Sequence, residues 1–318
     1  MRPLHPDAEG LLSLIRASGR PPFEQLAPAE ARVAYSAVRA ALQPPPEPTA
    51  ETQEHVIDGP GGALRLRAHR AVGTAADAVL PCLIYLHGGG WVLGDLDSHD
   101  GVCRRLANGG ACCVVAVDYR LAPEHPFPAA LDDAVAALAW AAEHSDTLRI
   151  DPRRIAVGGD SAGGNLAAVL ALMGRDGLVP RPVFQLLFYP VVDLAMTSDG
   201  YRLITAGVPL TAGTMRYFVD HYLPHPSARH DWRASPLRAA SLAGSAPALV
   251  VTVGQDPLCA EGRAYADRLE SEGVRVTALH LSDHVHGLLT MGRVIAAADP
   301  ILQFAGAALR DAWRLPAP

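Results

Sequence analysis

The sequence of 318 residues contains no lysine, because all 27 of its Lys+Arg positions are arginine. Skewed codon usage is the simplest explanation, but the absence still excludes a lysine Schiff base to pyridoxal phosphate, a P-loop lysine and a Ser-x-x-Lys acylation dyad. The formal net charge of −6 also argues against nucleic acid or an anionic membrane as a partner, since both require a basic protein surface.

Cysteine is scarce, and long apolar runs are absent. The five cysteines are odd in number and lack the spacing of a disulfide scaffold, and Cys112 and Cys113 lie in an apolar run as small core residues. No apolar run approaches the roughly 18 residues that a membrane span requires, and the N-terminal segment lacks the apolar stretch of a signal peptide. We therefore expect a cytoplasmic protein.

One stretch suggests a metal site, Asp283-His284-Val285-His286. Hydrolytic metal centres need further ligands at defined spacings, and no H-x-H-x-D-H or H-E-x-x-H pattern is present. The sequence therefore predicts neither a metal ion nor a cofactor.

Apolar segments alternate with helical patterns along most of the chain. Short buried strands separated by helices are typical of an α/β protein with a mainly parallel sheet covered on both faces, whose active site lies at the carboxyl ends of the strands. A hairpin at 54–72 is expected to open the sheet. The expected strands are 79–86, 112–118, 154–158, 183–189, 248–253 and 274–281, and the expected helices are 98–108, 127–143, 162–173 and 259–272.

The N-terminal part of the chain has a different pattern. Residues 1–50 contain helical patterns at 7–18 and 28–42 and close with a proline-rich run, which ends a helix and acts as a stiff connector. We interpret this part as a cap over a catalytic domain of residues 51–318. The segment at about 194–235 interrupts the alternation with turns, aromatic residues and prolines, and is expected to contribute to the cap.

The stretch from Gly159 to Gly163 fits the pattern G-x-S-x-G, between an apolar strand and a helical segment rich in Ala and Leu. A serine on so tight a turn needs small neighbours, which Gly159 and Gly163 supply. The turn lifts the hydroxyl off the sheet edge and presents backbone N–H groups at the positive end of a helix. Ser161 is the predicted nucleophile; the structural alternative is a glycine-rich turn that merely ends a strand.

Three consecutive glycines, Gly88 to Gly90, follow His87 at the end of another apolar strand. Glycine lets the backbone turn its N–H groups inward without a Cβ clash. This is the HGGG-type motif of lipases and esterases, which supplies oxyanion donors together with the N–H after the nucleophile, here that of Ala162. The alternative interpretation is a flexible glycine loop.

The acid and the base are expected on loops after late strands, in the order Ser, Asp or Glu, His. Asp256 follows a strand directly, whereas its rival Glu261 falls about one turn into the next helix. His284 and His286 are both plausible bases by position. Gly287 favours His286, because a small neighbour lets the ring approach the serine.

Together these motifs resemble the bacterial hormone-sensitive-lipase-like (family IV) carboxylesterases of the α/β-hydrolase superfamily. The resemblance covers roughly residues 55–318 and implies a mostly parallel eight-stranded sheet flanked by helices, with a helical cap. The stretches that carry it are His87 to Trp91, Asp118 to Ala130, Gly159 to Asn165, Tyr189-Pro190, Asp256-Pro257-Leu258 and His286-Gly287.

The resemblance also implies a function and a site. It implies hydrolysis of short- to medium-chain carboxylic esters through an acyl-enzyme, and a homodimer is compatible with it. Amidase or acyltransferase activity, or a non-catalytic ligand-binding protein on the same fold, are the alternatives. The implied catalytic residues are Ser161, Asp256 and His286, which decides between the two histidines, and the implied oxyanion hole comprises Gly88, Gly89, Gly90 and Ala162, with Gly88 shaping the loop and Asp118 to Arg120 bracing it.

Overall fold

The computed structural model describes residues 3–314. The first two residues of the predicted cap segment 1–50 and the last four of the predicted catalytic domain 51–318 lie outside the described residues.

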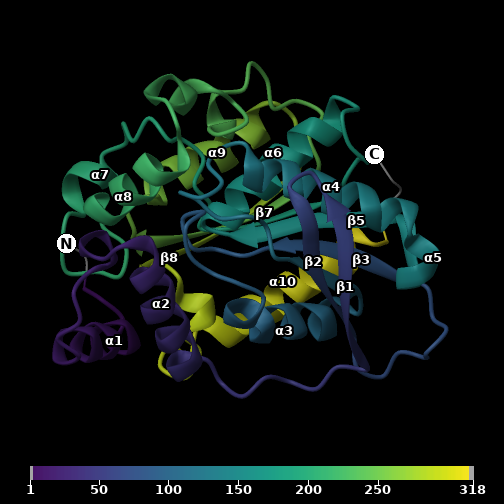
Figure 1. Ribbon diagram of the computed structural model, residues 1–318, viewed down its shortest axis with the longest axis horizontal. Coiled ribbons are helices and arrows are strands. Elements are labelled where there is room, and N and C mark those ends of the chain that lie inside the picture. The colour runs from purple at the N-terminus through teal and green to yellow at the C-terminus, as the bar shows by residue number, and fades with distance from the viewer. Residues whose placement is uncertain (1–2, 315–318) are drawn as a thin grey trace.

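An eight-stranded sheet forms the centre of the molecule, as predicted (Figure 1). The first two strands pair as an antiparallel hairpin, β2 is also antiparallel to β4, and every other neighbouring pair is parallel. The strand order is β1-β2-β4-β3-β5-β6-β7-β8. The strands are β1 (Glu51–Gly59), β2 (Gly62–Arg70), β3 (Leu80–Leu86), β4 (Cys113–Val117), β5 (Ile150–Asp160), β6 (Gln185–Phe188), β7 (Ala248–Gln255) and β8 (Val276–Val285).

The inner strands have the composition that burial on both faces requires. Every residue of β3, β4 and β6 is buried, and these strands are almost entirely apolar. The edge strand β1 instead alternates exposed with partly buried residues, because only one of its faces packs on the molecule.

Helices cover both faces of the sheet and enclose two apolar cores (Figure 1). One core packs α4, α6 and α9 on one face, and the other packs α3 and α10 on the opposite face. No helix among residues 3–314 has both the length and the hydropathy of a membrane span. The described helices are α1 (Pro6–Ala17), α2 (Pro28–Leu42), α3 (Asp100–Gly110), α4 (Ala129–Glu143), α5 (Ser145–Leu148), α6 (Ala162–Arg175), α7 (Gly200–Leu203), α8 (Ala212–Tyr222), α9 (Cys259–Ser271) and α10 (Ala298–Ala312).

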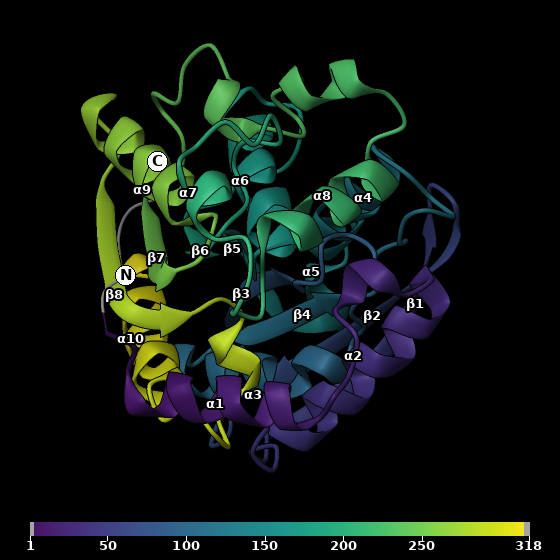
Figure 2. The ribbon, with the colours of Figure 1, turned by 90° about the vertical axis from the view of Figure 1, so that its left-hand side faces the viewer.

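The N-terminal helices lie on the same side of the molecule as α7 and α8 (Figure 2). The two parts touch, because the hydroxyl of Thr214 in α8 donates to Glu24 at 2.8 Å and that of Tyr217 donates to the carbonyl of Leu26 at 3.2 Å. Arg32 of α2 is bound to the main body through Glu124. Segments nearly 200 residues apart in sequence therefore form one structure beside the sheet.

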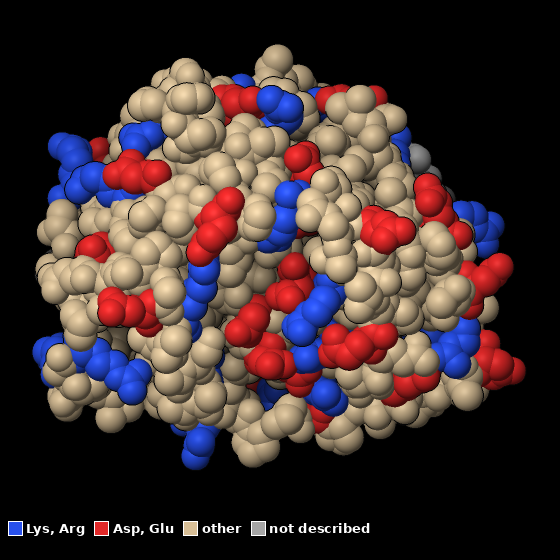
Figure 3. Space-filling view, viewed as in Figure 1, with Lys and Arg blue, Asp and Glu red and all other residues tan. Residues whose placement is uncertain are grey.

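Charged side chains are mixed over the face seen in Figure 3 rather than gathered by sign. Arg67, for example, contacts three carboxylates, those of Glu54, Asp97 and Asp100. Glu54 and Asp97 are exposed, and ion pairs with exposed partners contribute little to stability individually.

Candidate active site

Ser161 occupies the turn between β5 and α6 in a backbone conformation that non-glycine residues rarely adopt, with φ 56° and ψ −116°. Hydrogen bonds on both sides hold it there. Its N–H donates to the carbonyl of Phe188 at 2.9 Å, and its own carbonyl accepts from Asn165 at 3.0 Å and Val191 at 3.2 Å. The surrounding structure therefore maintains the strained turn that exposes the hydroxyl.

The two glycines that flank this turn are sterically required. A Cβ on Gly159 or on Gly163 would collide with the backbone carbonyl of Leu86, at the end of β3. Backbone atoms cannot move aside as the end of a flexible side chain can. These collisions confirm the prediction that small residues must flank Ser161.

His286 and Asp256 lie beside Ser161, although His286 is 125 residues from Ser161 and 30 residues from Asp256 in the sequence. Nε2 of His286 is 2.9 Å from Oγ of Ser161, and Nδ1 is 2.7 Å from Oδ2 of Asp256. Because a carboxylate can only accept, Nδ1 carries the proton and Nε2 is left to accept from the serine hydroxyl. The second oxygen of Asp256 accepts from the Leu258 N–H at 2.9 Å, which fixes the carboxylate.

The ends of two neighbouring strands position these groups. Asp256 follows β7 directly and is 1% exposed, and His286 follows β8 directly and is 8% exposed. The ring of Tyr189 packs against the His286 ring at a centroid distance of 4.6 Å. Gly287 has φ 78°, a conformation suited to glycine, and it turns the chain away after the histidine.

The two rival residues lie in other environments. Nδ1 of His284 is 2.8 Å from Asp283, and its ring lies 4.7 Å from that of His5. Glu261 accepts from the N–H groups of Val192 and Asp193, and burial raises the pKa of its carboxyl to about 8. Neither residue contacts Ser161 or His286 through a hydrogen bond among the described residues.

The glycine loop after β3 approaches the serine from the other side. The N–H of Gly88 donates to the buried carboxylate of Asp160 at 3.0 Å, so it is not available to a ligand. Gly89 and Gly90 have φ of 130° and 61°, and their N–H groups donate to no acceptor among the described residues. Ala162 is the first residue of α6, where an N–H has no partner within its helix.

Asp160 anchors that loop and was not predicted to have a role. Its carboxylate accepts from the Tyr85 hydroxyl at 2.9 Å and lies 3.2 Å from Nε2 of His99. Burial alone would raise the pKa of Asp160, but His99 and the hydrogen bonds outweigh burial and lower it to about 2. The group is therefore an anion that holds the loop against the nucleophile turn.

Tyr119 also supports the loop. Its hydroxyl donates to the carbonyl of His87 at 2.7 Å, and the two rings stack at 4.2 Å. Burial lowers the pKa of His87 to about 4, so this imidazole is neutral near pH 7. The bracing expected of the stretch Asp118 to Arg120 is visible in these contacts of Tyr119.

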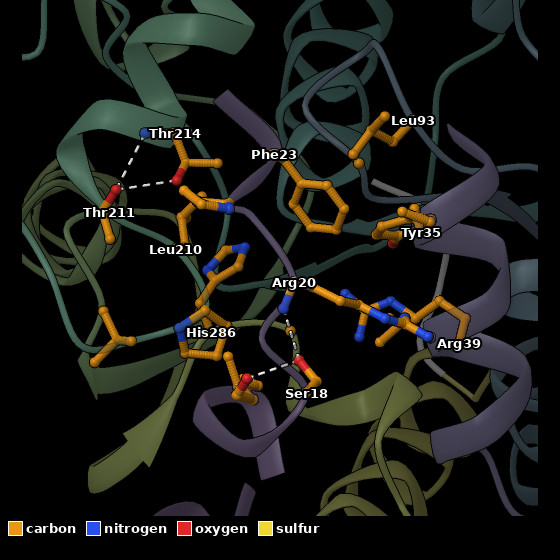
Figure 4. A pocket seen from close by; sticks show the side chains of 18 of the residues that line it. Ser18, Arg20, Phe23, Tyr35, Arg39, Leu93, Leu210, Thr211, Thr214 and His286 are labelled. Carbon is orange, nitrogen blue, oxygen red and sulfur yellow. Dashed lines mark hydrogen bonds between the residues drawn. The ribbon is translucent and has the colours of Figure 1, made fainter. Parts of the chain in front are cut away.

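Ser161 and His286 open into a cavity of about 1050 Å³ (Figure 4). Its floor includes Gly89 and Gly90, and its walls come from the α1–α2 region and from residues 207–218. Most of the lining is apolar, and Figure 4 shows the side chains of Phe23, Tyr35 and Leu210 around the space above His286. No group of three or more potential ligand side chains is placed to hold a metal ion within residues 3–314.

Known proteins resemble this chain in both sequence and structure. A family model described as the α/β-hydrolase fold matches residues 83–290. The chain is 36% identical over 302 residues to an ethyl acetate hydrolase of Pseudomonas putida, covering 93% of this chain and 95% of that protein. It is 43% identical over 254 residues to the carboxylic ester hydrolase LipN of Mycobacterium tuberculosis, covering 78% of this chain and 67% of that protein.

Among solved structures, an ester hydrolase from the metagenome of Lake Arreo, in complex with a bipyridine phosphonate derivative, superposes with a TM-score of 0.93. The two chains are 39% identical, and the match covers 97% of this chain and 98% of the other. The family model, the sequence relatives and this structure agree with the motifs and with the eight-stranded sheet. The chain belongs to the α/β-hydrolase family, in its hormone-sensitive-lipase-like esterase branch.

Proposed function

We propose that this protein is a serine carboxylesterase that hydrolyses short- to medium-chain carboxylic esters through an acyl-enzyme. The observation that carries the proposal is the continuous hydrogen-bonded chain from Ser161 through His286 to Asp256 at the floor of an apolar cavity. Relatives named carboxylic ester hydrolase and ethyl acetate hydrolase support the same class of substrate.

Acylation begins when Nε2 of His286 takes the proton of the Ser161 hydroxyl as its oxygen attacks the ester carbonyl. The imidazolium that forms is stabilised by the Asp256 carboxylate, 2.7 Å from Nδ1. The same Nε2 then gives its proton to the leaving alcohol oxygen, which leaves an acyl group on Ser161.

In this mechanism, backbone N–H groups beside Ser161 that have no other acceptor among the described residues bind the tetrahedral oxyanion. The N–H groups of Gly89, Gly90 and Ala162 face it in this proposal, while Gly88 shapes the loop because its own N–H is bound to Asp160. Each such donor contributes about 3 kcal/mol to transition-state stabilisation. Water activated by His286 then releases the acid by the reverse sequence of proton transfers.

The cap is assigned to residues 1–50 and to the segment at about 194–235, over a catalytic domain of residues 51–318. Supporting this division, Phe23 and Tyr35 line the cavity from one part and Leu210 from the other. These side chains would limit acyl-chain length and the access of water. The cytoplasmic location and a homodimer stay predictions from the sequence.

Replacement of the nucleophile tests the proposal. Ser161→Ala should lower kcat on p-nitrophenyl acetate by several orders of magnitude, with an unchanged melting temperature, because the hydroxyl takes no part in the packing of the fold. Near-normal activity in this folded variant would refute the assignment. The ester series from acetate to palmitate defines the acyl preference, and rates on a matched ester and amide separate esterase from amidase activity.

A further inference from the structure

The cavity contains a partly buried guanidinium group, that of Arg39, which forms no ion pair among residues 3–314. Arg39, in the last turn of α2, lines the same cavity as Ser161 and His286. Its Nε and Nη1 atoms are buried, and neither donates to an acceptor among residues 3–314. The guanidinium carbon lies 4.6 Å from the centroid of the Tyr35 ring, which orients the group without neutralising it.

The guanidinium group of Arg39 lies against the loop that carries the proposed base. Its Nη2 is 3.3 Å, and its Nη1 3.9 Å, from the position that a Cβ would take on Gly287, the residue after His286. Figure 4 shows Arg39 and Tyr35 extending from α2 toward the cavity, whose wall also carries His286. A group bound by Arg39 is therefore within the space that a substrate of Ser161 occupies.

The charges that line the cavity are not balanced. Its carboxylates are Asp160, which is paired with His99, and Glu30, which is exposed and bound to the backbone at the start of α2. Arg16 and Arg20 add two exposed guanidinium groups, and neither forms an ion pair within the described part of the chain. This cationic lining belongs to a protein of net charge −6, so it is a local feature of the cavity.

A partly buried guanidinium without an ion-pair partner, in a mostly apolar cavity, has the chemistry to bind an anion. Burial of a charge without a partner is costly, and a carboxylate offsets the cost through two parallel hydrogen bonds that match the guanidinium fork. The low local dielectric strengthens that pairing. Arg32, on the same helix, already has such a partner in Glu124, whereas Arg39 has none among residues 3–314.

We propose that Arg39 is a specificity residue that selects esters carrying a carboxylate group, which it binds while Ser161 attacks the ester carbonyl. This inference rests on the proposed esterase function. Two kinds of substrate present the required chemistry: half-esters of dicarboxylic acids, with the carboxylate on the acyl part, and acylated hydroxy acids, with the carboxylate on the alcohol part. Arg39 contacts only the remote carboxylate and not the reacting ester group. Its effect is therefore a difference in kcat/KM between esters that carry a carboxylate and esters that do not.

The test compares charged esters with uncharged esters of the same shape. Monoethyl glutarate and its neutral monoamide represent the acyl arm, and γ-acetoxybutyrate and γ-acetoxybutyramide represent the alcohol arm. In at least one arm, kcat/KM for the carboxylate should exceed that for the amide by about 10- to 100-fold, the range of one charge-assisted hydrogen-bonded pair. The arm with the larger ratio identifies the part of the substrate that faces Arg39.

Variants locate the cause of that preference. Arg39→Gln should reduce the ratio to near one, and Arg39→Lys should retain part of it, because the charge remains while the planar fork is lost. Arg153→Gln is the matched control, since it removes an arginine whose side chain is 84% exposed and bound to Asp151 away from the cavity, and the ratio should not change. Free glutarate should also inhibit p-nitrophenyl acetate hydrolysis by the unchanged protein more strongly than glutaramide does. This measurement does not depend on whether an Arg39 variant folds.

Three results would overturn the inference. They are equal kcat/KM values for carboxylate and amide in both arms, an unchanged ratio in folded Arg39→Gln, and equal inhibition by glutarate and glutaramide. If the neutral esters are still hydrolysed through Ser161, only the role of Arg39 fails. If no ester is hydrolysed, the proposed function fails as well.

Discussion

Replacement of Asp256 by asparagine tests the role of the carboxylate through its two hydrogen bonds. Oδ1 accepts from the Leu258 N–H at 2.9 Å, and Oδ2 lies 2.7 Å from Nδ1 of His286. Asparagine keeps the shape but has one oxygen and one NH2 group. One orientation places the NH2 group against the N–H of Leu258. This buried donor then has no acceptor, which costs about 1–3 kcal/mol in stability. The other orientation directs the NH2 group at His286.

The second orientation is favoured, because an imidazole can change tautomer at little cost while a backbone N–H cannot. Nδ1 of His286 then accepts from the asparagine, and the proton moves to Nε2, which faces Ser161 at 2.9 Å. A protonated Nε2 of a neutral ring cannot take the serine proton. We expect kcat to fall about 10⁴-fold, which corresponds to about 5 kcal/mol in the activation free energy.

The assay is the initial rate on p-nitrophenyl acetate with kcat and KM determined separately, together with thermal denaturation. KM should change little, and the protein should remain folded. Glu261→Gln is the control, because it makes the same carboxylate-to-amide change in the rival buried residue and should keep kcat near that of the unchanged protein. A loss of less than tenfold in Asp256→Asn, or an equal loss in both variants, would contradict the assignment of the acid.

Three further predictions follow from the packing and charge around the site. Gly163→Ala should destabilise the fold by at least about 3 kcal/mol in denaturant unfolding, because the new Cβ meets the carbonyl of Leu86; a change below 1 kcal/mol would show that the turn can relax. Glu261 has its pKa raised from 4.5 to about 8 by burial, so the native state holds a proton that the unfolded chain releases; its contribution to stability is complete below pH 4.5 and is lost as pH rises toward 8. Glu261→Gln should therefore flatten the free energy of unfolding over this range, and an unchanged slope would count against a protonated Glu261. Asp160→Asn should lower kcat at least tenfold with a smaller change in KM, since the anion that holds Gly88 is lost; wild-type kcat would show that the loop keeps its place without it.

Features encoded by adjacent residues could be predicted from the sequence. The strand–turn–helix around Ser161 follows from Gly159 and Gly163, whose absent side chains leave room for Leu86. The strands and helices of the sheet follow from the alternation of apolar segments. His286 could be separated from His284 only in part by the neighbouring glycine, and the family resemblance was needed to decide.

Features that depend on distant contacts could not be predicted. Asp160 and His99 are 61 residues apart, and nothing near either one shows that their side chains meet beneath the glycine loop. Arg39 is one of several arginines in the N-terminal helices, and only the packing of α2 against Gly287 reveals that its guanidinium faces the cavity. In both cases the information lies in tertiary packing rather than in a local pattern.

The central claim is that His286 activates Ser161 as a nucleophile, and covalent labelling with a p-nitrophenyl phosphonate tests it most directly. Because the chain has no lysine, trypsin cleaves only after arginine, and the peptide of residues 155–175 contains Ser161 as its only hydroxyl or thiol side chain. We expect stoichiometric phosphonylation of this peptide in the unchanged protein and at least a hundredfold slower labelling in His286→Ala, consistent with loss of the general base. A label on any other peptide, or equal labelling rates in the two proteins, would contradict the account.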